Sequence, residues 1–465
     1  MKQWLQPYAP TWAPTPAERT IKQLIWLYIV LWLLEGALRK WILPQYSAPL
    51  LVIRDPVAVL IIMQAVGKSI WRFNAWTWAL LLITGASACL SLAIGVPVTV
   101  IAFGVRTTLL HFPLIFIIER VLTREDVARL GRLFLDLSLP MALIMALQFV
   151  AGPDAFISKG VGTELGGQID AGGGRIRAPG FFSFITGAVQ FYGLIAAFLF
   201  SRMTWQRQWT KQAVLLPVVG LMLAVSISIS RSLAAEVVMV AIVFALVGVR
   251  IGIPFRRMVT LGSLFLLIVV IINITPLIQD GHQALLDRWT SAGDGFLAFL
   301  ERAFSSYTIN GDTVRAAGAA GFGLGMGTNA AGYLLTGEQS FMLAEDEWIR
   351  VLLEMGAPLG LAFILWRVGL TLSALRYCMQ SLKAKDPLAL LLLACGANTL
   401  LIGQIAQPTT QGFVTIFLGL AFAACNYSNE RMPAPVWGRP AVPSPQGRRG
   451  PEPRPAWNGG RSRNA

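Results

Sequence analysis

Apolar segments long enough to cross a membrane recur along almost the whole chain, separated by short charged or Gly- and Pro-containing stretches. A bilayer-spanning helix needs roughly 20 mostly apolar residues, and each of these segments comes close to that length. The pattern predicts about twelve transmembrane helices, near residues 22–38, 48–66, 75–95, 98–119, 133–151, 183–201, 212–229, 232–249, 259–276, 347–366, 388–406 and 411–427.

Composition supports the same fold class. Hydrophobic residues make up 55% of the 465 residues and charged residues only 13%, about half the charged share of a soluble domain. Lipid must therefore be the main solvent, which excludes a soluble enzyme and also a soluble domain on a single anchor. We expect an all-α, polytopic membrane helix bundle over residues 22–428.

The distribution of Lys and Arg predicts the orientation of this bundle. With segment 1–21 in the cytoplasm, every second linker is cytoplasmic, and all of those linkers are rich in Lys and Arg. The same count places the basic tail 429–465 inside, where its Pro, Gly and Arg content predicts disorder. This bias accounts for the net charge of +14, so nucleic acid is not an expected partner. We expect a multi-pass protein of the inner (plasma) membrane with both termini cytoplasmic.

Two long segments, roughly 152–182 and 277–346, are then predicted on the outer side of the membrane. The second carries apolar residues at helical spacing, which predicts one or two helices lying on the bundle. These residues are Leu285, Leu286, Trp289, Phe296, Leu297, Phe299 and Leu300. An ordered excursion of 70 residues is uncommon as a mere connector and usually marks a functional loop.

The positive-inside rule does not explain the basic residues near the predicted outer face, so their presence there indicates another role. They are Arg39, Lys40, Arg54, Arg175, Arg177, Arg231, Arg288, Arg302, Arg315 and Arg350. Guanidinium groups hold phosphates through a planar fork of donors, so several of them together would suit a lipid-linked pyrophosphate. The alternative is that most of them pair with the neighbouring carboxylates of Glu35, Asp55, Asp287 and Glu301.

Four local patterns stand out along the chain. They are GGRIRAPGFFSF at 173–184, SISISRSLAAE at 226–236, GFGLGMGTN at 321–329 and AEDEWIRVLLEMGAPLG at 344–360. In the third, alternating glycines let backbone approach a ligand closely. No βαβ unit surrounds these glycines, so they do not indicate a dinucleotide site.

In this order the four patterns resemble the O-antigen ligase and polymerase superfamily, which includes capsule and exopolysaccharide polymerases. The resemblance covers roughly residues 100–427. It rests on Gly180 after Arg177, the Ser230-Arg231-Ser232 corner, Gly321 to Gly327, and Glu354-Met355-Gly356. Where the family has His-Asn, this chain has Glu345-Asp346. The segments EGALRKW at 35–41 and IRDP at 53–56 match no motif of the family.

The resemblance implies glycosyl transfer on the outer face, without a nucleotide sugar, metal or other cofactor. The partners would be a polyprenyl-pyrophosphate-linked glycan as donor, an acceptor glycan or glycolipid, and membrane lipids. The implied substrate-binding residues are Arg177, Arg231, Arg302, Arg315, Gly323, Gly325 and Asn329. Glu345 would be the catalytic base, with Glu347 as its rival within the motif.

Other interpretations of the same residues remain open. A transporter or flippase of lipid-linked glycans or small solutes would use intramembrane charges such as Arg54, Asp55 and Arg106. A non-catalytic scaffold would not require the outer charges to cluster. The acids at 345–347 could also simply favour the N-terminus of the helix that follows them.

Overall fold

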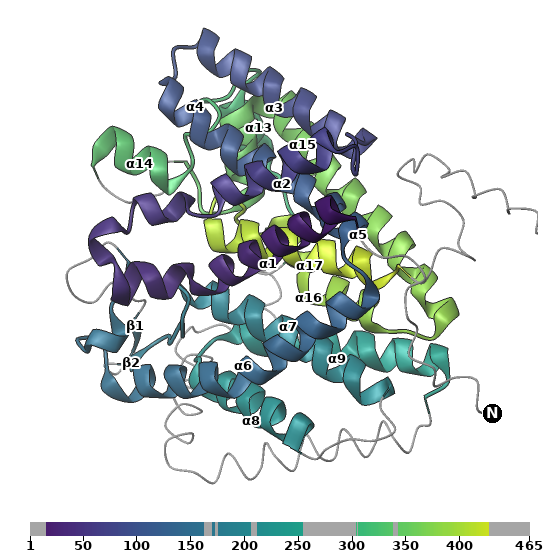
Figure 1. Ribbon diagram of the computed structural model, residues 1–465. Helices are drawn as coiled ribbons and strands as arrows, with labels where there is room; N and C mark the ends of the chain where they lie inside the picture. Colours follow the sequence, from purple (N-terminus) through teal and green to yellow (C-terminus); the bar gives the residue numbers. More distant parts are fainter. Residues whose placement is uncertain are drawn as a thin grey trace, which may run out of the picture.

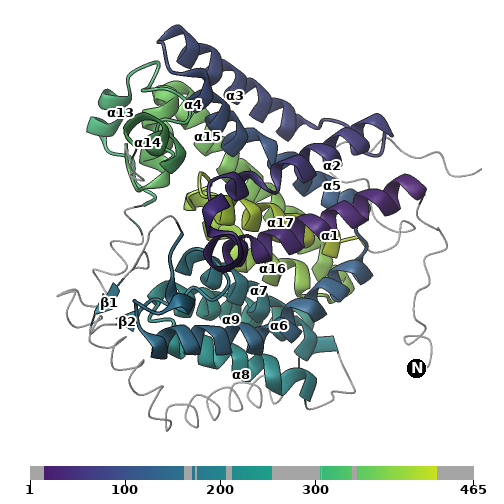
Figure 2. The ribbon, with the colours of Figure 1, turned by 60° about the vertical axis from the view of Figure 1, so that its left-hand side comes forward.

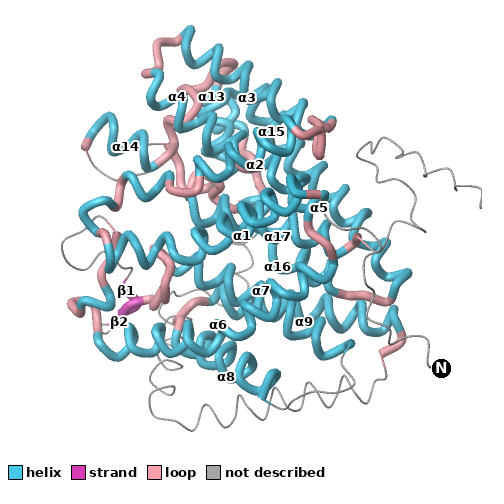
Figure 3. Tube along the Cα trace, viewed as in Figure 1, coloured by secondary structure: helices cyan, strands magenta, loops and turns pink. Residues whose placement is uncertain are grey.

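A computed structural model describes residues 15–161, 170–172, 175–205, 212–253, 304, 306–337 and 343–426. In these ranges the chain is a helical bundle with one small antiparallel ribbon, formed by β1 (Asp170–Gly172) and β2 (Arg175–Ile176) (Figures 1 and 3). The helices are α1 (Pro16–Ala37), α2 (Asp55–Gly67), α3 (Ala75–Ala93), α4 (Val98–Val105), α5 (Phe112–Val121), α6 (Arg124–Ala151), α7 (Ile185–Trp205), α8 (Gln212–Ile227), α9 (Arg231–Ile251), α13 (Gly311–Ala317), α14 (Asn329–Thr336), α15 (Glu347–Cys378), α16 (Leu388–Ile402) and α17 (Pro408–Ala424). Shorter π or 3-10 helices occupy Leu38–Ile42, Pro44–Tyr46, Pro49–Val52, Arg106–Leu110, Phe156–Ser158 and Met379–Ala384.

Within the described residues, eight helical segments are long and apolar enough to cross a membrane. Three shorter apolar helices, Val214–Ile227, Leu388–Ile402 and Pro408–Ala424, overlap further predicted spans. The all-α, multi-pass character expected from the sequence is therefore confirmed. The predicted span at 259–276, residues 277–303 of the predicted outer loop and the tail 429–465 lie outside the described residues. The count of twelve spans, the outer loop and the side of each terminus remain predictions.

The helices α16 and α17 lie in the middle of the bundle and are surrounded by α1, α5, α7, α9 and α15 (Figures 1 and 2). Every residue of α17 from Thr410 to Ala424 is buried. Small residues allow the close approach: Gly396 of α16 packs on the Phe417 ring, and Gly419 of α17 packs on Ile118. These two helices therefore form the core of the described bundle.

The predicted span at 347–366 is not one straight helix. Gly356 has φ +77° and ψ 163°, so it breaks α15 into a first arm of nine residues and a second arm of 22. The arms fold back on each other, because a Cβ atom on Gly360 would lie only 2.8 Å from the Cα of Leu352. Glu347 and Arg367, twenty residues apart, form an ion pair at 2.6 Å, whereas a continuous helix would separate them by about 30 Å.

Candidate functional site

The glycine-rich loop at 321–327 packs against the chain itself. Its backbone N–H groups at Gly325 and Gly327 donate to the two carboxylate oxygens of Glu354, at 3.2 and 2.9 Å. The N–H of Gly323 donates to the backbone carbonyl of Glu354 at 3.0 Å. Gly325 has φ +92°, and a Cβ atom there would clash with the carbonyl oxygen of Val100 in α4. These glycines therefore allow the loop to lie directly on α4 and on the tip of α15.

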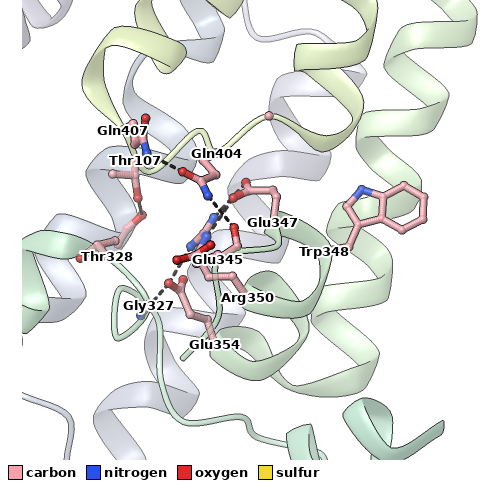
Figure 4. A network of polar contacts seen from close by, with 12 residues as sticks. Thr107, Gly327, Thr328, Glu345, Glu347, Trp348, Arg350, Glu354, Gln404 and Gln407 are labelled. Atoms are coloured by element: carbon pink, nitrogen blue, oxygen red, sulfur yellow. Dashed lines mark hydrogen bonds and ion pairs between the residues drawn. The ribbon is translucent and has the colours of Figure 1, made fainter. Parts of the chain in front are cut away.

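Glu354 belongs to a buried network of two acids and two arginines, of which Figure 4 labels Glu347, Arg350 and Glu354. Arg350 donates to Glu354 at 2.6 Å and to both oxygens of Glu347 at 2.9 and 3.0 Å. Arg367 reaches the same Glu347 carboxylate from the other arm of α15, at 2.6 Å. All four side chains are at most 2% exposed, and their charges balance. Glu347, one of the two predicted catalytic acids, is therefore held by two guanidinium groups.

Arg367 also links this network to the end of α16. Its guanidinium donates to the carbonyls of Leu400 and Gly403, at 2.7 and 2.9 Å. The last carbonyls of a helix have no partner within the helix, and they carry a partial negative charge. Arg367 therefore supplies both hydrogen bonds and the favourable charge at this helix terminus.

Glu345 and Asp346 lie at the surface beside the connector between α16 and α17. The side-chain amide of Gln404 donates to the backbone carbonyl of Glu345 at 2.6 Å (Figure 4). The side chains of Glu345 and Asp346 are exposed, and the Asp346 carboxylate accepts from the Ser306 hydroxyl at 3.1 Å. Asp346 is the N-cap residue of α15, but its side chain makes no capping hydrogen bond. The exposed side chains of Glu345 and Asp346 therefore belong to a backbone segment whose position is fixed by the contacts of Gln404 and Glu347.

A second charged network joins the first two spans to the central helices. Arg39 and Arg54 both contact Glu35, at 3.4 and 3.0 Å, and Arg106 donates to Asp55 at 3.1 Å. The pairs that Arg39 and Arg54 make with Glu35 are the alternative that the sequence left open for the basic residues near the outer face. The other two carboxylates of that alternative, Asp287 and Glu301, lie outside the described residues.

Arg177 lies on the turn that leads from β2 into α7. Its side chain is partly buried, and its fully buried Nε atom has no hydrogen-bond partner among the residues that the structure describes. The turn contains Gly180 in a left-handed conformation, with φ +62°. Of the predicted arginines, Arg177 thus has an unused donor on a fixed part of the backbone.

The remaining predicted residues are dispersed. Arg231 is the first residue of α9, where the Ser230 hydroxyl caps the helix, and Arg315 is an exposed residue of α13 that pairs with Asp312 at 3.6 Å. The two ribbon views place α13, which carries Arg315, and α9, which begins at Arg231, on different sides of α16 and α17 (Figures 1 and 2). Asn329 begins α14. Arg302 and the side chain of Asn329 lie outside the description.

Sequence reasoning missed Gln148 and Arg367, and it listed Lys40 only among the basic residues near the outer face. Each is a polar side chain within an apolar segment, and each is at most 1% exposed. Such residues in a membrane helix are costly without partners, so their presence alone was a usable signal. Across the part of the chain that the structure describes, no group of three or more His, Cys, Asp or Glu side chains could hold a metal ion.

No family model matches this sequence, and no curated protein matches it either. Its function must therefore be argued from these residues and their contacts.

Proposed function

We propose that this protein transfers a glycan from a polyprenyl pyrophosphate carrier to a hydroxyl group of an acceptor glycan at the outer face of the membrane. It would act as a polymerase or ligase of the O-antigen type. The observation that carries the proposal is the buried Nε atom of Arg177, which has no hydrogen-bond partner in the described part of the chain. By contrast, the buried residues Arg54, Arg350 and Arg367 all pair with carboxylates. An unused, fixed guanidinium donor suits an anionic ligand such as a phosphate.

The proposed transfer requires two chemical functions, stabilisation of the leaving pyrophosphate and activation of the acceptor hydroxyl. Departure of the pyrophosphate requires cations near the leaving group, for which Arg177 is our candidate. Attack by the acceptor hydroxyl requires a base, and we assign this role to Glu345. Glu347 is less suited, because two arginines hold its carboxylate, whereas the Glu345 side chain is exposed on a fixed backbone.

Deletion of the gene tests this proposal. Cells without the protein should accumulate polyprenyl-linked glycan units on the outer side of the membrane and lose long or ligated surface polysaccharide. Complementation with the wild-type gene should reverse both effects, and Arg177→Ala at equal abundance should not. Unchanged polysaccharide and unchanged lipid-linked glycans after deletion would exclude the proposed transfer.

Transport is the second candidate, because ionisable side chains form a connected chain within the first spans. The Tyr28 hydroxyl contacts Nδ1 of His111 at 2.8 Å, and Nε2 of His111 contacts Asp55 at 3.1 Å. Arg106 completes this chain through Asp55. Ionisable groups at membrane depth often mark a transport pathway. A flippase predicts that the deletion strain accumulates lipid-linked glycans only on the cytoplasmic side, which separates the two functions.

A further inference from the structure

The two N-terminal spans lie outside the family resemblance, yet α1 contacts the turn that carries Arg177. We propose that Lys40 and Gln148 are positioning residues that fix this turn, so that Arg177 receives an anionic phosphate group. This inference rests on the proposed function for the identity of the ligand, a polyprenyl pyrophosphate.

Gly180, three residues after Arg177, is held from two helices. The Lys40 ammonium, just beyond the end of α1, donates to the carbonyls of Gly180 and Phe182, both at 2.7 Å. The Gln148 side chain of α6 accepts from the N–H of Gly180 at 2.9 Å and donates to its carbonyl at 3.1 Å. Every backbone polar group of Gly180 is thereby bonded to a buried side chain. The position of the turn is consequently fixed by side chains far away in the sequence.

Packing fixes the turn further. Gly36 of α1 lies so close to it that a Cβ atom there would clash with the carbonyl oxygen of Phe181. The Phe182 ring packs on Trp32 of the same helix, with ring centroids 5.3 Å apart. Because α1 contacts the turn through backbone and rings at once, the turn cannot move without α1.

Among the residues that the structure describes, no carboxylate pairs with Arg177 or Lys40 at this turn. Lys40 is 1% exposed, and its contacts in the described part of the chain are carbonyl groups and the Trp41 ring, whose centroid is 4.5 Å away. Arg39, the neighbouring residue, instead pairs with Glu35. A buried cation is costly unless an anion or strong hydrogen bonds compensate for its lost hydration. At this turn the carbonyls of Gly180 and Phe182 supply those hydrogen bonds to Lys40, whereas a phosphate would compensate the charge of Arg177.

Binding of undecaprenyl pyrophosphate to the full-length protein tests the inference. The protein is placed in nanodiscs of zwitterionic phosphatidylcholine, which has no net charge. Arg177→Ala should weaken binding roughly 10- to 100-fold, as expected for the loss of charge-assisted hydrogen bonds. Lys40→Met should weaken it roughly tenfold. If Lys40 acts through the Arg177 turn, the double variant should bind no more weakly than Arg177→Ala alone. Lys68→Met, the same change at an exposed position, should bind like wild type.

The outcomes separate this inference from the proposed function. Additive losses in the double variant, or wild-type binding by Lys40→Met, would overturn the positioning role while leaving the proposed function intact. If Lys40→Met does not give folded protein, Gln148→Leu takes its place. The double variant of Gln148→Leu with Arg177→Ala should then bind no more weakly than Arg177→Ala alone. A parallel measurement with phosphatidylglycerol identifies the source of the phosphate. Binding of that lipid without binding of undecaprenyl pyrophosphate would refute the proposed function and keep the anion site, and binding of neither would overturn both.

Discussion

Replacing Arg367 by Met should strongly destabilise the protein without touching any exposed candidate residue. The change removes the 2.6 Å ion pair with Glu347 and the hydrogen bonds to the carbonyls of Leu400 and Gly403. Removing one partner of a buried ion pair costs about 3–5 kcal/mol. Glu347 keeps its second partner, Arg350, so we expect the lower end of this range, about 3 kcal/mol.

Thermal unfolding in detergent, followed by tryptophan fluorescence, measures this effect. A loss of this size should lower the Tm by roughly 5 °C. Arg376→Met, the same change at an exposed position of the same helix, is the matched control and should change stability by no more than about 0.5 kcal/mol. Equal Tm values for the two variants would refute the idea that the network holds α15 to α16. The double variant with Glu347→Gln should lose less than the sum of the single losses, because the two residues share one interaction.

Glu345→Gln is expected to abolish glycan transfer at normal abundance. Glu347→Gln should also lower the abundance of the protein, because the Glu347 carboxylate is ion-paired. Immunoblots of complemented deletion cells check both variants, and full activity of Glu345→Gln would exclude Glu345 as the base. Gly325→Ala should lower the Tm, because a side chain there would clash with the Val100 carbonyl, and an unchanged Tm would show that the loop is free to shift. A cysteine at Asn310, an exposed position, should react with an impermeant maleimide in intact cells; reaction only after lysis would reverse the predicted orientation.

Helix positions were readable from the sequence where an apolar run is bounded by a local signal. The predicted span 75–95 corresponds to α3, which begins after Asn74, whose side chain accepts from the N–H of Thr77 at 2.9 Å. The predicted span 232–249 corresponds to α9, which the Ser230 hydroxyl caps. Hydropathy and capping depend on residues near in sequence, so a single sequence carries enough information for both.

The reversal within α15 was not predicted, because hydropathy does not change across it. Residues 347–366 read as one apolar run, and Gly356 with Pro358 was the only local sign of a break. Gly and Pro so close together favour a turn, but in membrane helices both also occur without one. What fixes the reversal is the pairing of Glu347 with Arg367, which no local pattern encodes.

The sequence likewise did not predict which arginines stabilise the structure and which could bind a substrate. Arg54 pairs with Glu35, nineteen residues away, while Lys40, much nearer to Glu35 in sequence, bonds instead to the carbonyls of Gly180 and Phe182. Sequence distance therefore does not rank the possible partners. For the basic residues near the outer face, pairing with carboxylates holds for Arg39, Arg54 and Arg350. A role in phosphate binding remains a proposal for Arg177.

The length of the central helices explains why so many charged residues are structural. At 1.5 Å per residue, the 15 residues of α16 and the 17 of α17 span about 23 and 26 Å, less than the roughly 30 Å of a hydrocarbon core. The C-terminal end of α16 therefore leaves backbone carbonyls without helical partners within the bundle, where no water supplies hydrogen bonds. Arg367 serves the end of α16, while Trp32 donates to the Thr409 carbonyl at 2.9 Å. Side chains committed to these carbonyls are not available to a substrate, whereas Arg177 and Glu345 remain candidates for chemistry.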